Sequence, residues 1–144
     1  MSITNRDVYN NAISLIGESL QSEYIEDYEE RAPYLLASVT YQTLSLDKKI
    51  RNAEGLGPAG RFSPVFLSLD LDFPLCDHLA FPAALYVASL LVIDEDPDLS
   101  DTLYEKYCDT VSSLQTSFSV NESTSDDPAG MAICESITEK YFYD

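Results

Sequence analysis

Positive charge is scarce in this 144-residue chain. Eight lysines and arginines oppose 25 aspartates and glutamates, so the formal net charge is −17 at pH 7. A surface of this sign repels phosphates and anionic lipids, which excludes nonspecific binding of nucleic acids or membranes over most of the molecule. The chain is nevertheless not expected to be a disordered acidic polymer, because 45% of its residues are hydrophobic and can form a core.

Paired cysteines and long hydrophobic runs are also lacking. The three cysteines, at positions 76, 108 and 134, are odd in number and have no paired spacing, which indicates free thiols in a reducing compartment. The most apolar window, 79–93, is shorter than the roughly 20 residues that span a bilayer, and Pro82 interrupts it. Residues 1–9 do not resemble a signal peptide. We therefore expect no membrane partner and interpret 79–93 as a buried helix.

Glycine is rare, but three of the five glycines gather in one loop. Gly55, Gly57 and Gly60 match the G-x-G-x-x-G pattern of dinucleotide-binding loops. That pattern holds a pyrophosphate only when it follows a strand and begins a helix, whereas here a helix is expected before it and a proline-bounded segment after it. We interpret 53–64 as a Gly/Pro-rich flexible loop that binds no nucleotide cofactor.

A catalytic or metal-binding constellation is missing from the sequence. His78 and Cys76 cannot close a zinc site without two more ligands, and they are not placed as a nucleophile and its base. Asp94, Asp96, Asp98 and Glu105 match positions 1, 3, 5 and 12 of a calcium-binding loop. Position 6 of such a loop is a glycine, but here it is Leu99. We instead expect Asp98 or Ser100 to cap a helix that begins there. The chain is therefore predicted not to be an enzyme and to use no cofactor or metal.

Helical periodicity dominates the rest of the chain. Thr4 and Asp7 form a predicted capping box, and Gly17 has the position of a C-terminal cap. Apolar residues at alternating steps of four and three predict a second helix that starts near Ala32, with Asp27 as an alternative cap. We predict a mainly α fold, a small four-helix bundle, with helices over 4–17, 32–52, 77–93 and 99–118.

One segment breaks the helical pattern. Val65–Phe73 lies between Pro64 and Pro74 and alternates apolar and polar residues from Leu67 onward, which predicts one short strand between the second and third helices. A lone strand leaves backbone N–H and C=O groups unpaired unless the C-terminal end, another copy of the chain or another protein supplies a partner. We therefore predict a docking site for a neighbouring copy of the chain or another protein, formed by Gly55, Gly57, Gly60, Arg61, Phe62, Val65, Leu67, Leu69 and Leu71.

Charge and composition divide the chain further. Half of the basic residues flank the Gly/Pro-rich loop, where they favour an acidic neighbour; they are Lys48, Lys49, Arg51 and Arg61. Residues 119–144 are rich in Ser, Asp and Glu through their first half and regain apolar residues only near the end. We predict a helical domain over 1–118, followed over 119–144 by a partly flexible acidic linker and a short C-terminal element.

The order of these elements resembles the phage head–tail connector family, the head-completion or neck adaptor proteins. The resemblance covers residues 3–118. It is carried by DVYNNAISLIGE, by RAPYLLASVTYQTLSLDKKIR, by the loop and segment that end in LDFPL, and by ALYVASLLVIDEDPDLSDTLYEKYCDTV.

The resemblance implies a structural protein of a virion or prophage. Members of this family form a ring, commonly of about a dozen copies, that joins the portal protein to a tail or stopper protein. They are assembled in the bacterial cytoplasm, they end in the virion neck, and the genome passes through them without specific binding. The implied partners are thus further copies of the chain, the portal and the tail-side protein.

The acidity fits a DNA conduit, because a carboxylate lining repels the polyanion while a basic lining would bind it. The acids predicted to line or rim the channel are Glu23, Glu26, Asp27, Glu29, Glu30, Asp94, Glu95 and Asp96. An alternative function is that of an acidic DNA mimic that inhibits a DNA-binding protein. Such a mimic needs the clustered carboxylates but neither the alternating segment nor the Gly-rich loop.

Overall fold

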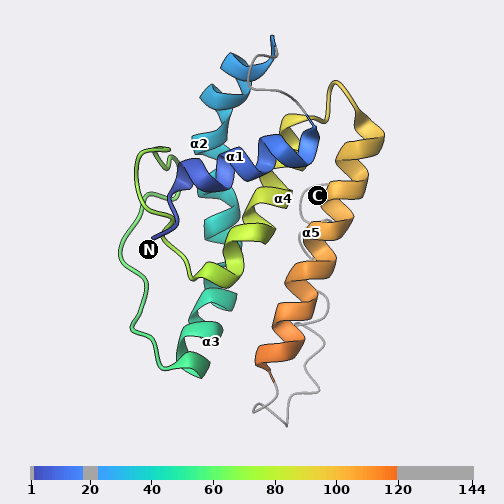
Figure 1. The fold of residues 1–144 in the computed structure, drawn as a ribbon. Helices are drawn as coiled ribbons and strands as arrows, with labels where there is room; N and C mark the ends of the chain where they lie inside the picture. Colours follow the sequence, from blue (N-terminus) through green and yellow to red (C-terminus); the bar gives the residue numbers. More distant parts are fainter. Residues whose placement is uncertain (1, 18–22, 120–144) are drawn as a thin grey trace.

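The computed structural model describes residues 2–17 and 23–119, and these form a mainly helical domain. In those two ranges the structure contains five α-helices, one short 3-10 helix and no β-strand (Figure 1). The prediction of a mainly α fold is therefore confirmed, whereas the count of four helices is wrong. The elements are α1 (Asn5–Ile16), α2 (Ile25–Gln42), α3 (Leu44–Glu54), η1 (Asp77–Leu79), α4 (Ala80–Leu91) and α5 (Pro97–Phe118).

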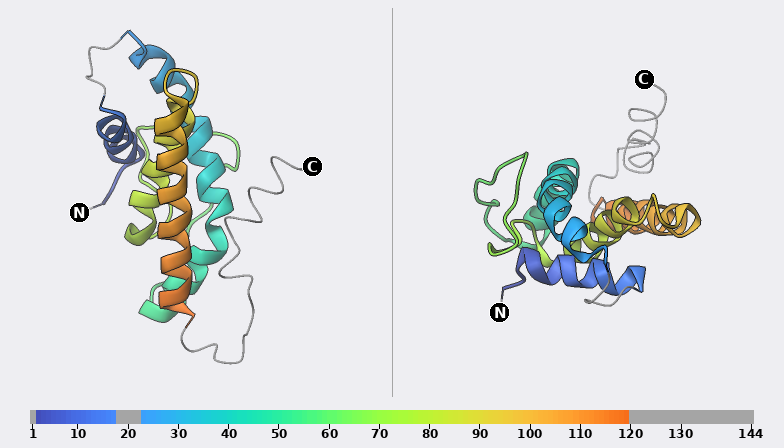
Figure 2. Two further views of the ribbon diagram at one scale, coloured as in Figure 1. Left: turned by 90° about the vertical axis from the view of Figure 1, so that its right-hand side faces the viewer. Right: turned by 90° about the horizontal axis from the view of Figure 1, so that it is seen from above.

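Helix α4 lies at the centre of the domain. Every residue from Pro82 to Ser89 is buried, and α4 packs against α1, α2 and α5. Helices α2, α3, α4 and α5 run along the long axis of the described domain, and α1 lies across them (Figures 1 and 2). A helix without a polar face needs cover on most sides, and the predicted buried helix is confirmed at the centre of the domain. It is shorter than predicted, because η1 precedes it and it ends at Leu91, and Phe81 and Ile93 are exposed.

Helix α1 is delimited by local signals. The Thr4 hydroxyl accepts a hydrogen bond from the Asp7 amide at 3.1 Å, and the Asp7 carboxylate accepts one from the Thr4 amide at 2.9 Å. Gly17 ends the helix with φ of 81°, a left-handed conformation that glycine adopts without the steric penalty of a Cβ atom. Both predicted caps are therefore confirmed.

The second predicted helix is two helices. Helix α2 begins at Ile25, before the predicted start near Ala32, and keeps Pro33 in its interior. It ends at Gln42, and α3 begins two residues later. Thr43 occupies the break, where its hydroxyl donates to the Val39 carbonyl at 2.8 Å, a back-bond that competes with regular helix geometry. The predicted apolar seam nevertheless continues through the break, since its six members are buried: Ala32, Leu36, Val39, Thr43, Leu46 and Ile50.

Helix α5 begins at Pro97 and has a different cap from the one predicted. The Asp96 carboxylate accepts a hydrogen bond from the Leu99 amide at 3.1 Å, so Asp96 rather than Asp98 or Ser100 is the N-cap. Pro97 occupies the first helical position, where its missing N–H leaves no donor unpaired. The Ser100 hydroxyl instead donates to the Ser89 carbonyl of α4 at 2.7 Å, which ties the two helices together near their connection.

The predicted strand at Val65–Phe73 is wrong. The segment has turns and a single antiparallel bridge, between Thr4 and Asp72. Within the described ranges, its backbone groups pair with the N-terminal end of the same chain and with α2. The bonds are Asn5 N to Leu71 O at 2.9 Å, Arg6 N to Leu69 O at 3.0 Å, Phe73 N to Ile3 O at 2.8 Å and Leu67 N to Pro33 O at 3.0 Å.

The alternation of the segment is only partly reflected in burial. Leu67, Leu69 and Phe73 are buried, whereas Leu71 is 57% exposed. The Leu71 amide donates to the Ser68 carbonyl at 3.2 Å, which is a turn, and a turn interrupts the two-residue period that places alternate side chains on one face. The predictions for the linker and short element beyond Ser119 lie outside the described residues.

Candidate functional site: the docking groove and the acidic end

A buried ion pair holds the start of the Gly/Pro-rich loop. The fully buried Asp47 carboxylate accepts a bond from Arg51 Nε at 2.8 Å and another from the Cys76 amide at 2.7 Å. The Arg51 guanidinium also donates to the Gly57 carbonyl at 3.0 Å and to the Pro74 carbonyl at 3.3 Å. We call these contacts the Asp47–Arg51 clamp. It connects α3 to both ends of the linker between α3 and η1.

The clamp changes the role predicted for Arg51. This guanidinium is committed to contacts within the chain, so it does not face a neighbour. Sequence reasoning also missed Asp47, although an acid four residues before an arginine on one helix is a recognisable pairing signal. Gly55 belongs to the same region and ends α3 with φ of 71°. Gly55 and Gly57 therefore shape the exit from α3.

The remaining loop residues form an open groove against α2 and α3. The groove has a volume of about 360 Å³ and is lined by Tyr41, Leu44 and Lys48 from the helices, and by residues 58–62 and Pro64 from the loop. It thus includes Gly60, Arg61 and Phe62 of the predicted docking site. Most of its lining side chains are apolar, with Lys48 and Arg61 as the two cations. We refer to it as the docking groove.

The cations of the docking groove differ from the other basic residues near it. Lys49 Nζ donates to Gln115 Oε1 of α5 at 3.4 Å, and Arg51 belongs to the clamp. Lys48 and Arg61 are exposed, and within 2–17 and 23–119 they make no ion pair or side-chain hydrogen bond. In a chain with three times as many acids as bases, these two charges are available to an acidic ligand.

Next to the groove, the loop exposes apolar side chains. Val65 is 64% exposed, and Phe66 packs edge-on against Tyr34 of α2 with ring centroids 5.1 Å apart. Leu71 is exposed as well. Leu67 and Leu69, by contrast, are 4% and 5% exposed. They contribute to the core in this conformation, so the surface open to a partner includes Val65 and Leu71 but not Leu67 or Leu69.

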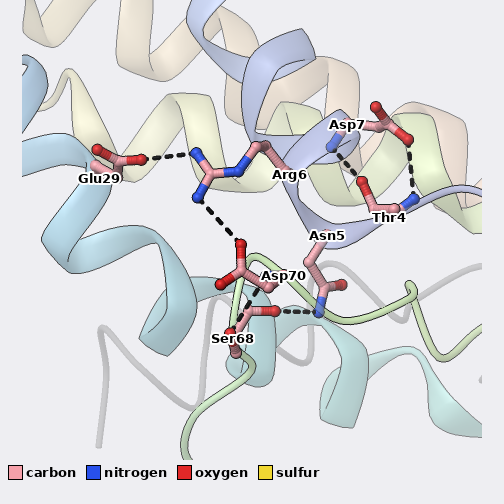
Figure 3. A network of polar contacts seen from close by, with 7 residues as sticks. All are labelled: Thr4, Asn5, Arg6, Asp7, Glu29, Ser68 and Asp70. Atoms are coloured by element: carbon pink, nitrogen blue, oxygen red, sulfur yellow. Dashed lines mark hydrogen bonds and ion pairs between the residues drawn. The ribbon is translucent and has the colours of Figure 1, made fainter.

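The N-terminal end of α1 is joined to this region by a polar network (Figure 3). Arg6 Nη1 lies 2.7 Å from Glu29 Oε1 of α2, and Arg6 Nη2 lies 3.5 Å from Asp70 Oδ1. The two carboxylates raise the pKa of the Arg6 guanidinium, mainly through the Glu29 hydrogen bond. The side-chain amide of the buried Asn5 donates from Nδ2 to the Ser68 carbonyl at 2.9 Å. Glu29, predicted as a channel-lining acid, is therefore paired within the chain.

The other predicted channel acids gather at one end of the domain. The start of α2 and the connection from α4 to α5 lie together at that end in both side views (Figures 1 and 2). The buried Tyr28 joins them, because its hydroxyl donates to Glu95 Oε1 at 2.5 Å. We call this surface the acidic end; its exposed acids are Glu23, Glu26, Asp27, Glu30, Asp94, Glu95 and Asp96.

Some acids of that surface have structural roles of their own. Asp27 pairs with Arg31 at 3.3 Å on the same helix, Glu95 accepts the Tyr28 bond, and Asp96 caps α5. For Glu23, Glu26, Glu30 and Asp94 the structure records no hydrogen bond or ion pair within the described ranges. These four are therefore the unpaired carboxylates of the acidic end.

Cys76 and His78 do not form a reactive pair. Burial, together with the neighbouring Asp47 carboxylate, raises the pKa of the Cys76 thiol to about 12, which disfavours the nucleophilic thiolate. His78 Nε2 lies 2.8 Å from Glu54 Oε2, and its ring packs against Phe118 with centroids 5.4 Å apart. No group of three or more His, Cys, Asp or Glu side chains placed to hold a metal ion occurs in the described part of the chain.

No family model, no curated protein and no solved structure matches this chain. Within residues 2–17 and 23–119, no helix is both long enough and apolar enough to cross a membrane.

Proposed function

We propose that this chain is a structural adaptor of a phage or prophage neck, a subunit that assembles into a ring between portal and tail through which DNA passes. One observation carries the proposal: a group of free carboxylates lies at the acidic end, whereas two unpaired cations and a group of exposed apolar side chains lie at the docking groove and the adjoining loop. A ring subunit needs both a surface that binds its neighbours and a surface that does not bind the genome.

The acidic end suits contact with moving DNA. Free carboxylates repel phosphate, and they offer no sites from which DNA could release bound counterions. The docking groove and the exposed Val65, Phe66 and Leu71 suit contact with protein, because apolar and aromatic groups dominate the centres of protein interfaces. On this proposal the loop faces the portal or a neighbouring subunit, and the acidic end faces the channel.

An acidic DNA mimic remains the alternative, because the same carboxylates would compete with DNA for a basic protein. The two functions differ in what the isolated chain does. A ring subunit increases in mass as its concentration rises or when portal is added, whereas a mimic stays small and displaces DNA from a DNA-binding protein. Sedimentation velocity over a wide concentration range, with and without portal, separates them. A monomer under all of these conditions would contradict the adaptor.

The lining hypothesis has its own test. Replacing Glu26, Glu30 and Asp94 by lysine should preserve the fold, since all three are exposed, and should slow DNA packaging and ejection by creating phosphate-binding sites. The matched control reverses three exposed acids elsewhere: Asp72, Glu105 and Asp109. Particles that contain the control subunit should show normal rates. Normal rates with the first variant would contradict the lining, while ring formation would still be measured separately by mass.

A further inference from the structure

We propose that the docking groove binds the acidic, aromatic segment 120–144 of the same chain. This occupancy concerns the isolated chain, so it goes beyond the proposed adaptor function and does not depend on it; a portal or neighbouring subunit that docks at the groove would displace the segment on assembly. Three observations support the occupancy: the chemistry of the groove, the chemistry of the segment, and the place where α5 delivers the chain.

The groove selects for a ligand that is both apolar and negatively charged. Tyr41, Leu44 and Phe62 supply apolar contact area, and Tyr41 is 63% exposed although it borders the cavity. Lys48 and Arg61 are the unpaired cations of the groove. An occupant that carried only charge would leave the apolar lining in water, and an apolar occupant would leave both cations unused.

The segment 120–144 has that combination. It contains six acids against one lysine, a net charge of −5, and it includes the aromatic run Tyr141–Tyr143 between Glu139 and Asp144. Aromatic side chains bring the largest contact area per residue to such a site, and carboxylates next to lysine and arginine form charge-assisted hydrogen bonds. We place the aromatic run against Tyr41 and Phe62, with flanking carboxylates near Lys48 and Arg61.

Helix α5 delivers the chain close to the groove. Gln115, in the last turn of α5, contacts Lys49, which is the residue next to Lys48. Phe118, the last residue of α5, packs against His78 near the end of α3. A stretch of 25 residues can extend to roughly 80 Å, which is more than twice the roughly 33 Å length of the 22-residue α5, so it can reach the groove. The linkage also keeps the segment at a high effective concentration near the groove.

A nitroxide on the segment tests the placement in the full-length protein. The label is attached to Cys134 in a Cys108→Ser background, because the buried Cys76 thiol is unreactive at neutral pH. Amide resonances of groove residues 59–62 should broaden, while those of exposed residues elsewhere, such as Asn10, should not. The effect should be lost in a Lys48→Glu, Arg61→Glu variant and retained in Lys106→Glu, which reverses an exposed lysine of α5 outside the groove.

A mixed sample decides which chain supplies the segment. Protein without 15N that carries the nitroxide on Cys134 is combined with 15N-labelled protein that carries no nitroxide. The mixture is kept at a concentration where the protein is monomeric. We expect no broadening of the groove amides in this mixture. Broadening there would assign the groove to a second copy and overturn the proposal. Absence of broadening in the single-chain sample, with an otherwise native spectrum, would overturn it as well.

The contribution of the aromatic run is tested separately. Replacing Tyr141, Phe142 and Tyr143 by serine removes the apolar part of the ligand and leaves its charge unchanged. We expect at least a tenfold rise in the fraction of chains with an unoccupied groove, measured from the loss of broadening. Full broadening with this variant would show that charge alone brings the segment to the groove, and would contradict insertion of the aromatic side chains.

Discussion

The linker between α3 and η1 has two halves with opposite properties. Residues 57–66 are almost all exposed, and no backbone amide among them bonds to a backbone carbonyl. Residues 67–76 contribute five buried side chains and pair with the N-terminal end, with α2 and with Asp47. The boundary falls at Leu67, whose amide donates to the Pro33 carbonyl.

The difference shows that one linker contains two parts, one that packs in the core and one that forms a surface open to a ligand. The second half supplies buried apolar side chains to the core of the domain. The first half carries Gly, Pro and Arg61 and forms one wall of the docking groove. Binding residues are often found on such surface loops. Variants can therefore act on one half without the other.

The largest effect is expected at the Asp47–Arg51 clamp. An Asp47→Ala change leaves the Arg51 guanidinium without its carboxylate and the Cys76 amide without its acceptor, so we expect the free energy of unfolding to fall by roughly 4 kcal/mol. Urea unfolding measures the loss. Asp72→Ala removes an exposed acid from the same linker and should change stability by less than about 0.5 kcal/mol. Equal effects would show that the clamp does not hold the linker.

A matched pair of leucines tests the second half of the linker. Leu69 is buried and Leu71, two residues later, is exposed. We expect Leu69→Ala to lower the free energy of unfolding by about 2–3 kcal/mol, through lost apolar burial and the cavity left behind. Leu71→Ala should cost less than about 0.5 kcal/mol. A larger loss for Leu71→Ala, measured by thermal or urea unfolding, would contradict the turn at Ser68–Leu71.

A pH effect is expected at Cys76. Its pKa is raised to about 12 in the folded protein from an ordinary value of 9.0, so the folded state holds the thiol proton more tightly. The associated stability is present below pH 9 and is lost as the pH rises towards 12, by about 1 kcal/mol between pH 8 and pH 10. Cys76→Ala should lack this component. If wild type and variant lost stability in parallel over that range, the buried thiol would not be the cause.

The smallest effect on stability is expected in the first half of the linker. Deleting Pro58–Gly60 keeps Gly55, which ends α3, and Gly57, which contacts Arg51, so the free energy of unfolding should change by less than about 1 kcal/mol. The same deletion removes one wall of the docking groove. It should therefore weaken assembly with the portal and abolish the broadening of groove amides. Unchanged assembly with a native melting curve would show that the loop is not the docking surface.

The features predicted correctly depend on neighbours in the sequence. The Thr4 capping box, the Gly17 cap and the seam through Ala32 and Ile50 are local or periodic patterns, and the structure has each of them. The buried α4 follows from the lack of polar residues around that helix. Such patterns determine backbone conformation or burial without reference to the rest of the fold.

The errors arise where distant segments meet. Nothing near Val65–Phe73 in the sequence shows that residues 3–6 will pair with it, so the alternation alone predicts a strand with a free edge. The break at Thr43 depends on a competing side-chain bond, and the role of Arg51 depends on Pro74, 23 residues away. The docking and channel-lining roles stay predictions, because they concern partners outside the chain.

The pairing of residues 3–6 with the linker also affects the order in which the protein can fold during synthesis. Helix α1 leaves the ribosome first, yet the linker and α4, on which it packs, end roughly 75 residues later. At about 5–20 residues per second, α1 waits roughly 4–15 s for its partners. A 12-residue helix has little stability alone in water. Helix α1 is made before the other described helices and is therefore among the last of them to become stable, and the nascent chain exposes its apolar face during that interval.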